Sequence, residues 1–174
     1  PGIKIIMTSG NSDDVIRQLF EYRADIGELG QAPEDERLLT MPLRTDPIVA
    51  FVPKDHAWAK RRKISLVELS REPMVLREIG STTRQLVEAE LHRLGVKAQL
   101  VMEVEGREAA REAVAAGIGV GIVSEPEFGH DERLVSIKLS DCKASMTESL
   151  VCLKERANFR LIEAFLTEAQ HYLT

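Results

Sequence analysis

The middle of the chain alternates short apolar runs with segments of helical spacing, and this alternation limits the folds open to it. The pattern predicts strands at 74–76, 99–104 and 117–123, with helices over 83–94 and about 107–116 between them. Elements of this length in this order require parallel strands with helices packed on both faces. We therefore predict an α/β fold in which mainly parallel sheets are flanked by helices.

The flanking segments read in the same way. An alternation of Ile3, Ile5 and Met7 predicts an opening strand, and the last apolar helical face, over 158–172, predicts a closing helix. The remaining elements that we expect are a helix over 15–20, a helical turn at 66–69, and strands at 24–27, 38–43, 47–52, 134–139 and 149–153.

Composition excludes several classes of protein. The 174 residues are 44% hydrophobic and 29% charged, which is enough for one sizeable core or two small lobes. A net charge of -5 argues against a nucleic-acid surface on this chain, because phosphate binding needs an excess of Lys and Arg. No apolar run reaches the ~18 residues of a membrane span, and no apolar leader opens the chain. We expect a cytoplasmic protein without membrane contact.

Residues that carry catalysis or bind metal are scattered. Cys142 and Cys152 have neither CxxC nor zinc-like spacing, and reduced thiols are the expected state in the cytosol. His56 reads as a surface turn residue. The spacing of Gly117, Gly119 and Gly121 lies inside a strand, so close packing explains it better than a nucleotide site. We predict no metal, no cofactor and no enzymatic turnover.

Three hydroxyl residues, Ser81, Thr82 and Thr83, stand where a strand turns into a helix. The backbone N–H groups of a helix start are unpaired, and together with hydroxyls they can hold a small anion. The competing interpretation is that these residues only cap the helix, which stabilises it by about 1 kcal/mol each. Capping and binding are compatible.

Four segments in order resemble one known family. Pro1–Ile5 resembles an early strand, Arg23–Gly27 together with Leu19 a "GxLDLAI" segment, Lys54–Ala59 an "HPLA" crossover, and Val114–Val120 a "VAAGxGI" run. The chain resembles the effector-binding domain of LysR-type transcriptional regulators over essentially its whole length. It departs from the family at Ala57, where proline is usual, and at Trp58, where leucine is typical.

The resemblance implies a two-lobed fold of the type II periplasmic-binding-protein kind, with a small effector in the cleft between the lobes. One lobe would comprise residues 1–52 plus 149–174, and the other residues 53–148. It also implies that the winged helix-turn-helix, its linker helix, and the first strand and helix of the first lobe precede Pro1. DNA would be contacted only through that missing part, and the whole protein would be a homodimer or homotetramer.

Carried over residue by residue, the effector-binding positions fall at helix starts. Ser12 follows Gly10 and Asn11 in the first lobe. Ser81, Thr82 and Thr83 match the facing position in the second lobe, and a third helix starts at Gly106 and Arg107. Three positive helix ends aimed at one cleft favour an anionic effector, such as a carboxylate.

Other interpretations stay open at this point. Arg84 and Arg107 are better explained as solvated side chains, or as paired with nearby carboxylates such as Glu88, Glu105 or Glu108, than as residues that contact the effector directly. A periplasmic solute-binding protein, or a small enzyme on the same fold, would share the cleft.

Overall fold

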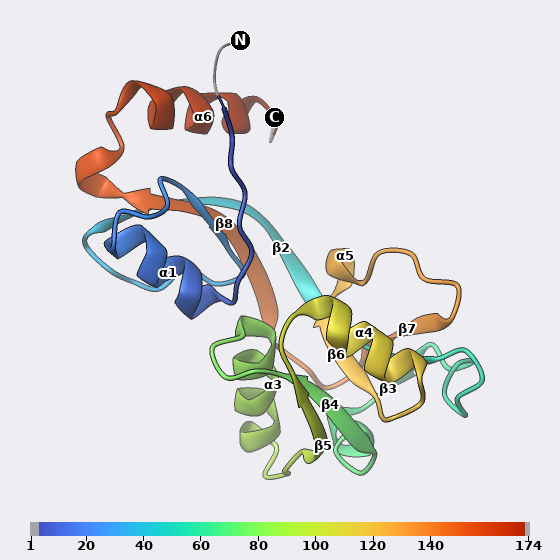
Figure 1. Ribbon diagram of the computed structural model, residues 1–174. Helices are drawn as coiled ribbons and strands as arrows, with labels where there is room; N and C mark the ends of the chain where they lie inside the picture. The colour runs from blue at the N-terminus through green and yellow to red at the C-terminus, as the bar shows by residue number, and fades with distance from the viewer. Residues whose placement is uncertain (1–3, 173–174) are drawn as a thin grey trace.

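A computed structural model describes residues 4–172 of the chain, and it has the predicted mixture of helices and strands (Figure 1). In chain order the elements are α1 (Ser12–Phe20), β1 (Gly27–Leu29), β2 (Leu38–Pro53), β3 (Lys63–Ile64), α2 (Leu66–Leu69), β4 (Pro73–Arg77), α3 (Thr82–Arg93), β5 (Gln99–Val104), α4 (Arg107–Ala115), β6 (Gly121–Ser124), α5 (Glu125–Phe128), β7 (Leu134–Leu139), β8 (Ser145–Leu153), a 3₁₀ turn (Lys154–Arg156) and α6 (Arg160–His171). None of the helices within 4–172 is long and apolar enough to cross a bilayer.

Two long antiparallel strands, β2 and β8, connect the two ends of the molecule. Their register runs from Leu38 opposite Leu153 to Pro47 opposite Ser145, with an irregularity at Pro42. Figure 1 shows α1 and α6 at one end of this pair and α3, α4 and α5 at the other. We call these the α1 end, which also holds β1, and the α3 end, which holds everything from β3 to β7.

The predicted β-α-β-α-β unit is confirmed at the α3 end. Strands β4 and β5 pair in parallel, and Met74 of β4 makes a parallel bridge to Val120, just before β6. Along the chain, α3 connects β4 to β5, and α4 connects β5 to β6. The alternation of elements therefore predicted the local topology correctly.

The expectation of mainly parallel sheets is wrong for the strands around β2. Within residues 4–172, the ladders β1–β8, β2–β8, β2–β6 and β2–β7 are antiparallel, and only β3–β7 and β4–β5 are parallel. The segments predicted as separate strands at 38–43 and 47–52 form the single strand β2. An alternation of helices and strands in the sequence predicts that helices connect the strands. It does not determine whether a long strand such as β2 pairs with its neighbours in parallel or antiparallel.

The strand predicted at the start of the chain is not formed. Ile3 lies outside the described residues, and Ile5, Ile6 and Met7 are exposed and in no regular structure. A strand needs a neighbour for its backbone N–H and C=O groups. Within residues 4–172 this segment has no partner strand, so its alternating apolar residues do not form a strand.

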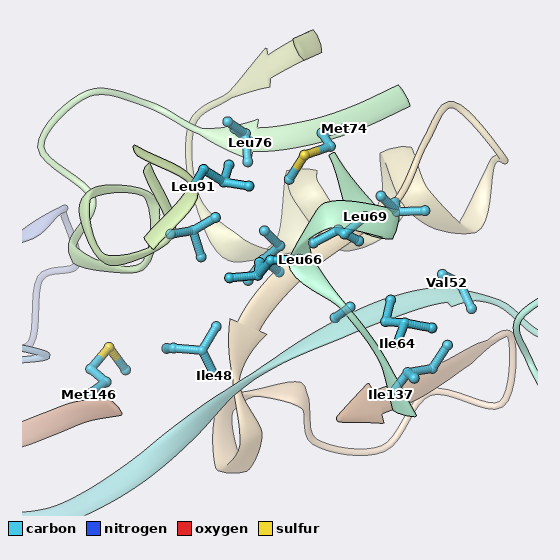
Figure 2. Packing of buried hydrophobic residues seen from close by; sticks show 14 residues of the cluster. Ile48, Val52, Ile64, Leu66, Leu69, Met74, Leu76, Leu91, Ile137 and Met146 are labelled. Atoms are coloured by element: carbon cyan, nitrogen blue, oxygen red, sulfur yellow. The ribbon is translucent and has the colours of Figure 1, made fainter. Parts of the chain in front are cut away.

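The largest core cluster lies at the α3 end and is centred on the short helix α2. Figure 2 shows Leu66 and Leu69 of this helix surrounded by Met74, Ile64 and Ile137. Ser65 and Glu68 form a reciprocal capping box that fixes where α2 begins, and both leucines are fully buried. A helix of four residues is stable here because tertiary packing, rather than helix propensity, holds it.

The glycine run is explained by packing, as predicted, at two of its three positions. A Cβ on Gly119 would overlap the Pro73 carbonyl oxygen, and one on Gly121 would overlap the Phe51 ring. Gly117 has open space around it but has a φ of +77°, which ends α4 in the left-handed region that glycine favours.

Candidate functional site

The starts of α1 and α3 are in direct contact. The Oγ of Ser12 and the Oγ1 of Thr82 are 2.8 Å apart, although the two residues are 70 positions apart in sequence. Each residue is the first of its helix, so the contact brings two helix N-termini together. Two positions that were predicted to face one another across a cleft therefore form a hydrogen bond.

Simple capping does not account for these hydroxyls. The N-cap of α1 is Asn11, whose Oδ1 accepts from the Asp14 backbone N–H at 3.0 Å. Ser81 is the N-cap of α3, and its side chain makes no capping hydrogen bond. The Ser12 and Thr82 hydroxyls are thus available for each other, or for a ligand, while the backbone ends of both helices stay beside them.

The loops before the two helices fit closely. Asn11 Nδ2 donates to the Ile79 carbonyl at 3.4 Å. Gly80 has a φ of +93°, and a Cβ there would lie 2.9 Å from Asp13 Oδ2. A residue other than glycine at this position would have a strained backbone, and its Cβ would crowd the side-chain oxygens of Asp13 and Asn11.

The start of α4 is tied to the same region through Glu78. The Gly106 backbone N–H donates to Glu78 Oε2 at 3.3 Å, and Arg77 donates twice to the same carboxylate, at 2.7 Å from Nε and from Nη2. These hydrogen bonds from Arg77 lower the pKa of Glu78 to about 2. An ionised Glu78 therefore joins the strand before α3 to the start of α4.

Beside this junction lies a small pocket between α4, α5 and β2. The six residues that matter most to its chemistry are Phe51, Arg77, Thr83, Arg107, Glu127 and Phe128. Its cavity of about 20 Å³ has room for one water molecule. A metabolite would enter only if side chains moved or the two ends of the molecule separated.

The pocket is lined by more positive than negative groups. Arg107 Nη1 lies 2.6 Å from Glu127 Oε1, and the Arg111 guanidinium donates to the carbonyl oxygens of Glu127 and Phe128 at 3.2 and 2.8 Å. Burial raises the pKa of the Glu127 carboxyl, an effect that the charge of Arg107 opposes. The chain as a whole is acidic, so this group of arginines is a local exception.

The family is established over the whole length of the chain. The family model described as LysR substrate binding domain matches residues 1–174. The chain belongs to this family. Its curated relatives are transcriptional regulators and not enzymes, so the function class of the family is regulation.

Two of these relatives match this LysR domain over part of their own length. CmpR, an HTH-type transcriptional activator of Synechocystis sp. (strain ATCC 27184 / PCC 6803 / Kazusa), is 33% identical over 124 residues, which are 71% of this chain and 41% of CmpR. CbbR of Xanthobacter flavus is 32% identical over 126 residues, which are 71% of this chain and 38% of CbbR. The chain spans about two fifths of the length of these relatives.

Solved structures confirm the predicted fold class. The regulatory domain of Synechocystis PCC6803 CcmR, in complex with 2-PG, has a TM-score of 0.84 at 22% identity and matches 94% of this chain and 80% of that one. The effector-binding domain of QuiR, in complex with shikimate, also gives 0.84, at 19% identity, with 94% and 78% covered. The LysR domain thus has an α/β fold of the type II periplasmic-binding-protein kind.

The structure divides the predicted effector residues into two neighbouring sets. Asn11, Ser12 and Thr82 meet at the contact between α1 and α3, while Thr83 and Arg107 line the pocket. Ser81 is buried without a side-chain cap bond, Gly10 packs on Asp14 of its own helix, and Gly106 is held by Glu78. No metal-binding group of three His, Cys, Asp or Glu side chains occurs within residues 4–172.

Several pocket residues were not anticipated. Phe51, Arg111, Glu127 and Phe128 belong to no motif, and α5 is too short to show a helical period in sequence. Arg84 is paired with Glu88, as its competing interpretation predicted, and also with Glu103. Arg107 pairs with Glu127 and not with its sequence neighbours Glu105 or Glu108.

The cysteines and His56 have the structural roles expected of them. Both cysteines are free, and burial raises the pKa of each thiol, which favours its protonated form. His56 Nδ1 accepts from the Trp58 backbone N–H at 3.2 Å in the turn after β2.

Proposed function

We propose that this LysR domain senses a small anionic metabolite that binds where the starts of α1, α3 and α4 meet. In this proposal, occupancy is passed to a winged helix-turn-helix elsewhere in an intracellular, homo-oligomeric regulator. The hydrogen bond between Ser12 and Thr82 is the observation that carries the proposal. Two hydroxyls beside two helix N-termini can exchange this bond for bonds to one ligand oxygen.

The contact also supplies a means of signalling. We take residues 1–52 with 149–174 as one lobe and 53–148 as the other. A ligand inserted between Ser12 and Thr82 has to separate the ends of the molecule that these residues belong to. Occupancy then favours one arrangement of the lobes over another, which is the differential interaction that a conformational signal requires.

The ligands of the two neighbouring structures support an anion. CcmR was solved with 2-PG, which is 2-phosphoglycolate, and QuiR with shikimate. The first carries a phosphate and a carboxylate, and the second a carboxylate. Both groups suit helix N-termini and an arginine beside them.

A thermal-shift screen of small carboxylates, phosphorylated acids and sulfated metabolites tests the proposal. A ligand at 100 times its Kd stabilises by about 2.7 kcal/mol. For a domain of this size the unfolding temperature then rises by roughly 5–10 °C. Ser12→Ala and Thr82→Ala should each abolish the rise, because each removes one of the two hydroxyls that face the ligand.

The control is another pair of hydroxyls. Thr45 Oγ1 and Thr147 Oγ1 lie 2.9 Å apart on the exposed surface of β2 and β8. Thr45→Ala removes a similar contact away from the helix starts and should leave the rise intact. If the Ser12 and Thr82 variants respond to ligand as the wild-type chain does, the site is elsewhere.

A further inference from the structure

The pocket beside α4 already contains a carboxylate on its most accessible arginine. Arg107 is about half exposed, and its Nη1 contacts Glu127 Oε1 at 2.6 Å. A guanidinium has five N–H donors, so further donors remain for a ligand. The group that Glu127 offers to Arg107 is the same group that a small organic acid would offer.

Glu127 is carried on a rigid support. Helix α5 follows β6 without a loop, and Arg111 holds its end by donating to the carbonyls of Glu127 and Phe128. The Phe128 ring lies 6.0 Å from the Phe51 ring of β2. Since the backbone of α5 is held at both ends, the Glu127 carboxylate separates from Arg107 through rotation of the two side chains and not through movement of the helix.

The surroundings of Glu127 weaken its hold on Arg107. Its side chain is only 14% exposed, and burial raises the pKa of its carboxyl. The charged groups around it come from four other strands and helices, and they partly cancel. Those that favour its ionised form are Arg107 and Arg77, those that oppose it are Glu148 and Glu28, and Arg111 of α4 holds its backbone.

We propose that Glu127 is an internal counter-ion that occupies the anion site on Arg107 until an anionic effector displaces it. The inference rests on the function proposed above and adds a regulatory element to the same site. It assigns Glu127 as a residue that tunes affinity: its carboxylate occupies the anion site on Arg107, and an effector anion has to bind Arg107 better than Glu127 does in order to displace it.

The displacement has a definite dependence on pH. When an anion replaces Glu127 on Arg107, the Glu127 carboxyl loses a cation and gains a negative neighbour, so its pKa rises further. The complex therefore binds a proton more readily than the free domain does. Affinity for the anion increases as the pH falls below the pKa that Glu127 has in the complex, and it levels off below the lower pKa that Glu127 has in the free domain.

Sulfate and 2-phosphoglycolate are suitable probes, and sulfate stays a dianion across the range from about pH 5 to 8. Glu127→Gln should bind both about three- to tenfold more tightly than the wild-type chain, and its sulfate affinity should no longer depend on pH in this range. Glu125→Gln is the matched control, since it makes the same change on the same helix where the carboxylate is 3.7 Å from Lys138. It should leave the affinities near the wild-type values.

A second variant ties the gain to Arg107. Replacing Arg107 by Gln in the Glu127→Gln background should remove the gain, because the anion then has no guanidinium to bind. The proposal is overturned if Glu127→Gln binds these anions no better than the wild-type chain, or if its gain persists without Arg107. If the wild-type chain binds an organic acid but Glu127→Gln binds anions no more tightly, the role of Glu127 as a counter-ion is rejected while the sensor function stands. If Glu127→Gln binds sulfate more tightly but the domain binds no organic acid, the sensor function is rejected instead.

Discussion

The two ends of the molecule differ in how well they are packed. Within residues 4–172, the main cluster at the α3 end has fourteen buried side chains, while the cluster at the α1 end has five. Of the large exposed apolar residues within 4–172, five lie at the α3 end and nine at the α1 end, and these nine are Ile5, Ile6, Met7, Tyr22, Leu39, Phe159, Leu161, Phe165 and Tyr172. Segments with little burial open first. The proposed effector contact thus joins a firmly packed region to a loosely packed one, and the loose end is the one expected to move.

Replacing three leucines one at a time by alanine gives the test with the largest expected effects, because each loss of stability reports how well that leucine is packed. Leu66 in the large cluster and Leu19 in the small one are both fully buried, whereas Leu161 of α6 is 62% exposed. Leu66→Ala should cost about 4–5 kcal/mol of unfolding free energy, and Leu19→Ala about 2–3 kcal/mol, because a thinly covered site collapses more easily around the cavity. Leu161→Ala should change stability by less than about 0.5 kcal/mol.

Urea unfolding of the three variants provides the measurement, with the denaturant slope checked for each. Equal losses for Leu66→Ala and Leu19→Ala would show that the two ends are equally well packed, and the proposed difference in mobility would lose its basis.

The second test concerns what keeps the α3 end rigid. The Arg77–Glu78 pair is 14% exposed on both sides and links the starts of α3 and α4. Glu78→Gln should cost roughly 1.5–3 kcal/mol at pH 7, as expected for hydrogen bonds to a charged group. At the α1 end the exposed pair of Glu21 and Arg23 is the control, and Glu21→Gln should have almost no effect.

The pH dependence of this loss follows from the lowered pKa. The pKa of Glu78 falls from 4.5 to about 2 on folding. Its contribution is therefore complete above about pH 4.5 and is lost as the pH falls through about 2. Wild type and Glu78→Gln should converge in stability over this range in acid-denaturation curves. A constant difference between them down to about pH 2 would contradict the role given to the ion pair.

The same contrast between the ends explains which elements the sequence predicts well. Helix α3, strand β5 and helix α4 lie within one or two residues of their predicted bounds, because each carries its own apolar period and a local stop such as Gly95. The predicted face of α6 has only Ile162 buried, and the opening alternation pairs with nothing in residues 4–172. Periodicity states what a segment is able to bury, while the partner that buries it is set by tertiary structure.

The candidate site divides along similar lines. Hydroxyls at helix starts can be recognised from sequence, and the closeness of Ser12 to Thr82 then follows from the fold. Glu127 has no such signal, because its partner Arg107 is twenty positions away and the fold alone brings them together. Pairings of side chains across elements depend on rotamers and on crossover geometry, which local spacing does not encode.

The smallest expected effect tests the contact between the two ends directly. Without ligand, Ser12→Ala and Thr82→Ala should each lower stability by about 0.5–1.5 kcal/mol, the usual net value of one hydrogen bond. The double variant should lose less than the sum, because both single changes break the same bond. The Thr45 and Thr147 pair is more exposed and should show weaker coupling in the same cycle. Additive losses at Ser12 and Thr82 would mean that the hydroxyls do not hold the two ends together in solution, and a ligand would then have no closed contact to open.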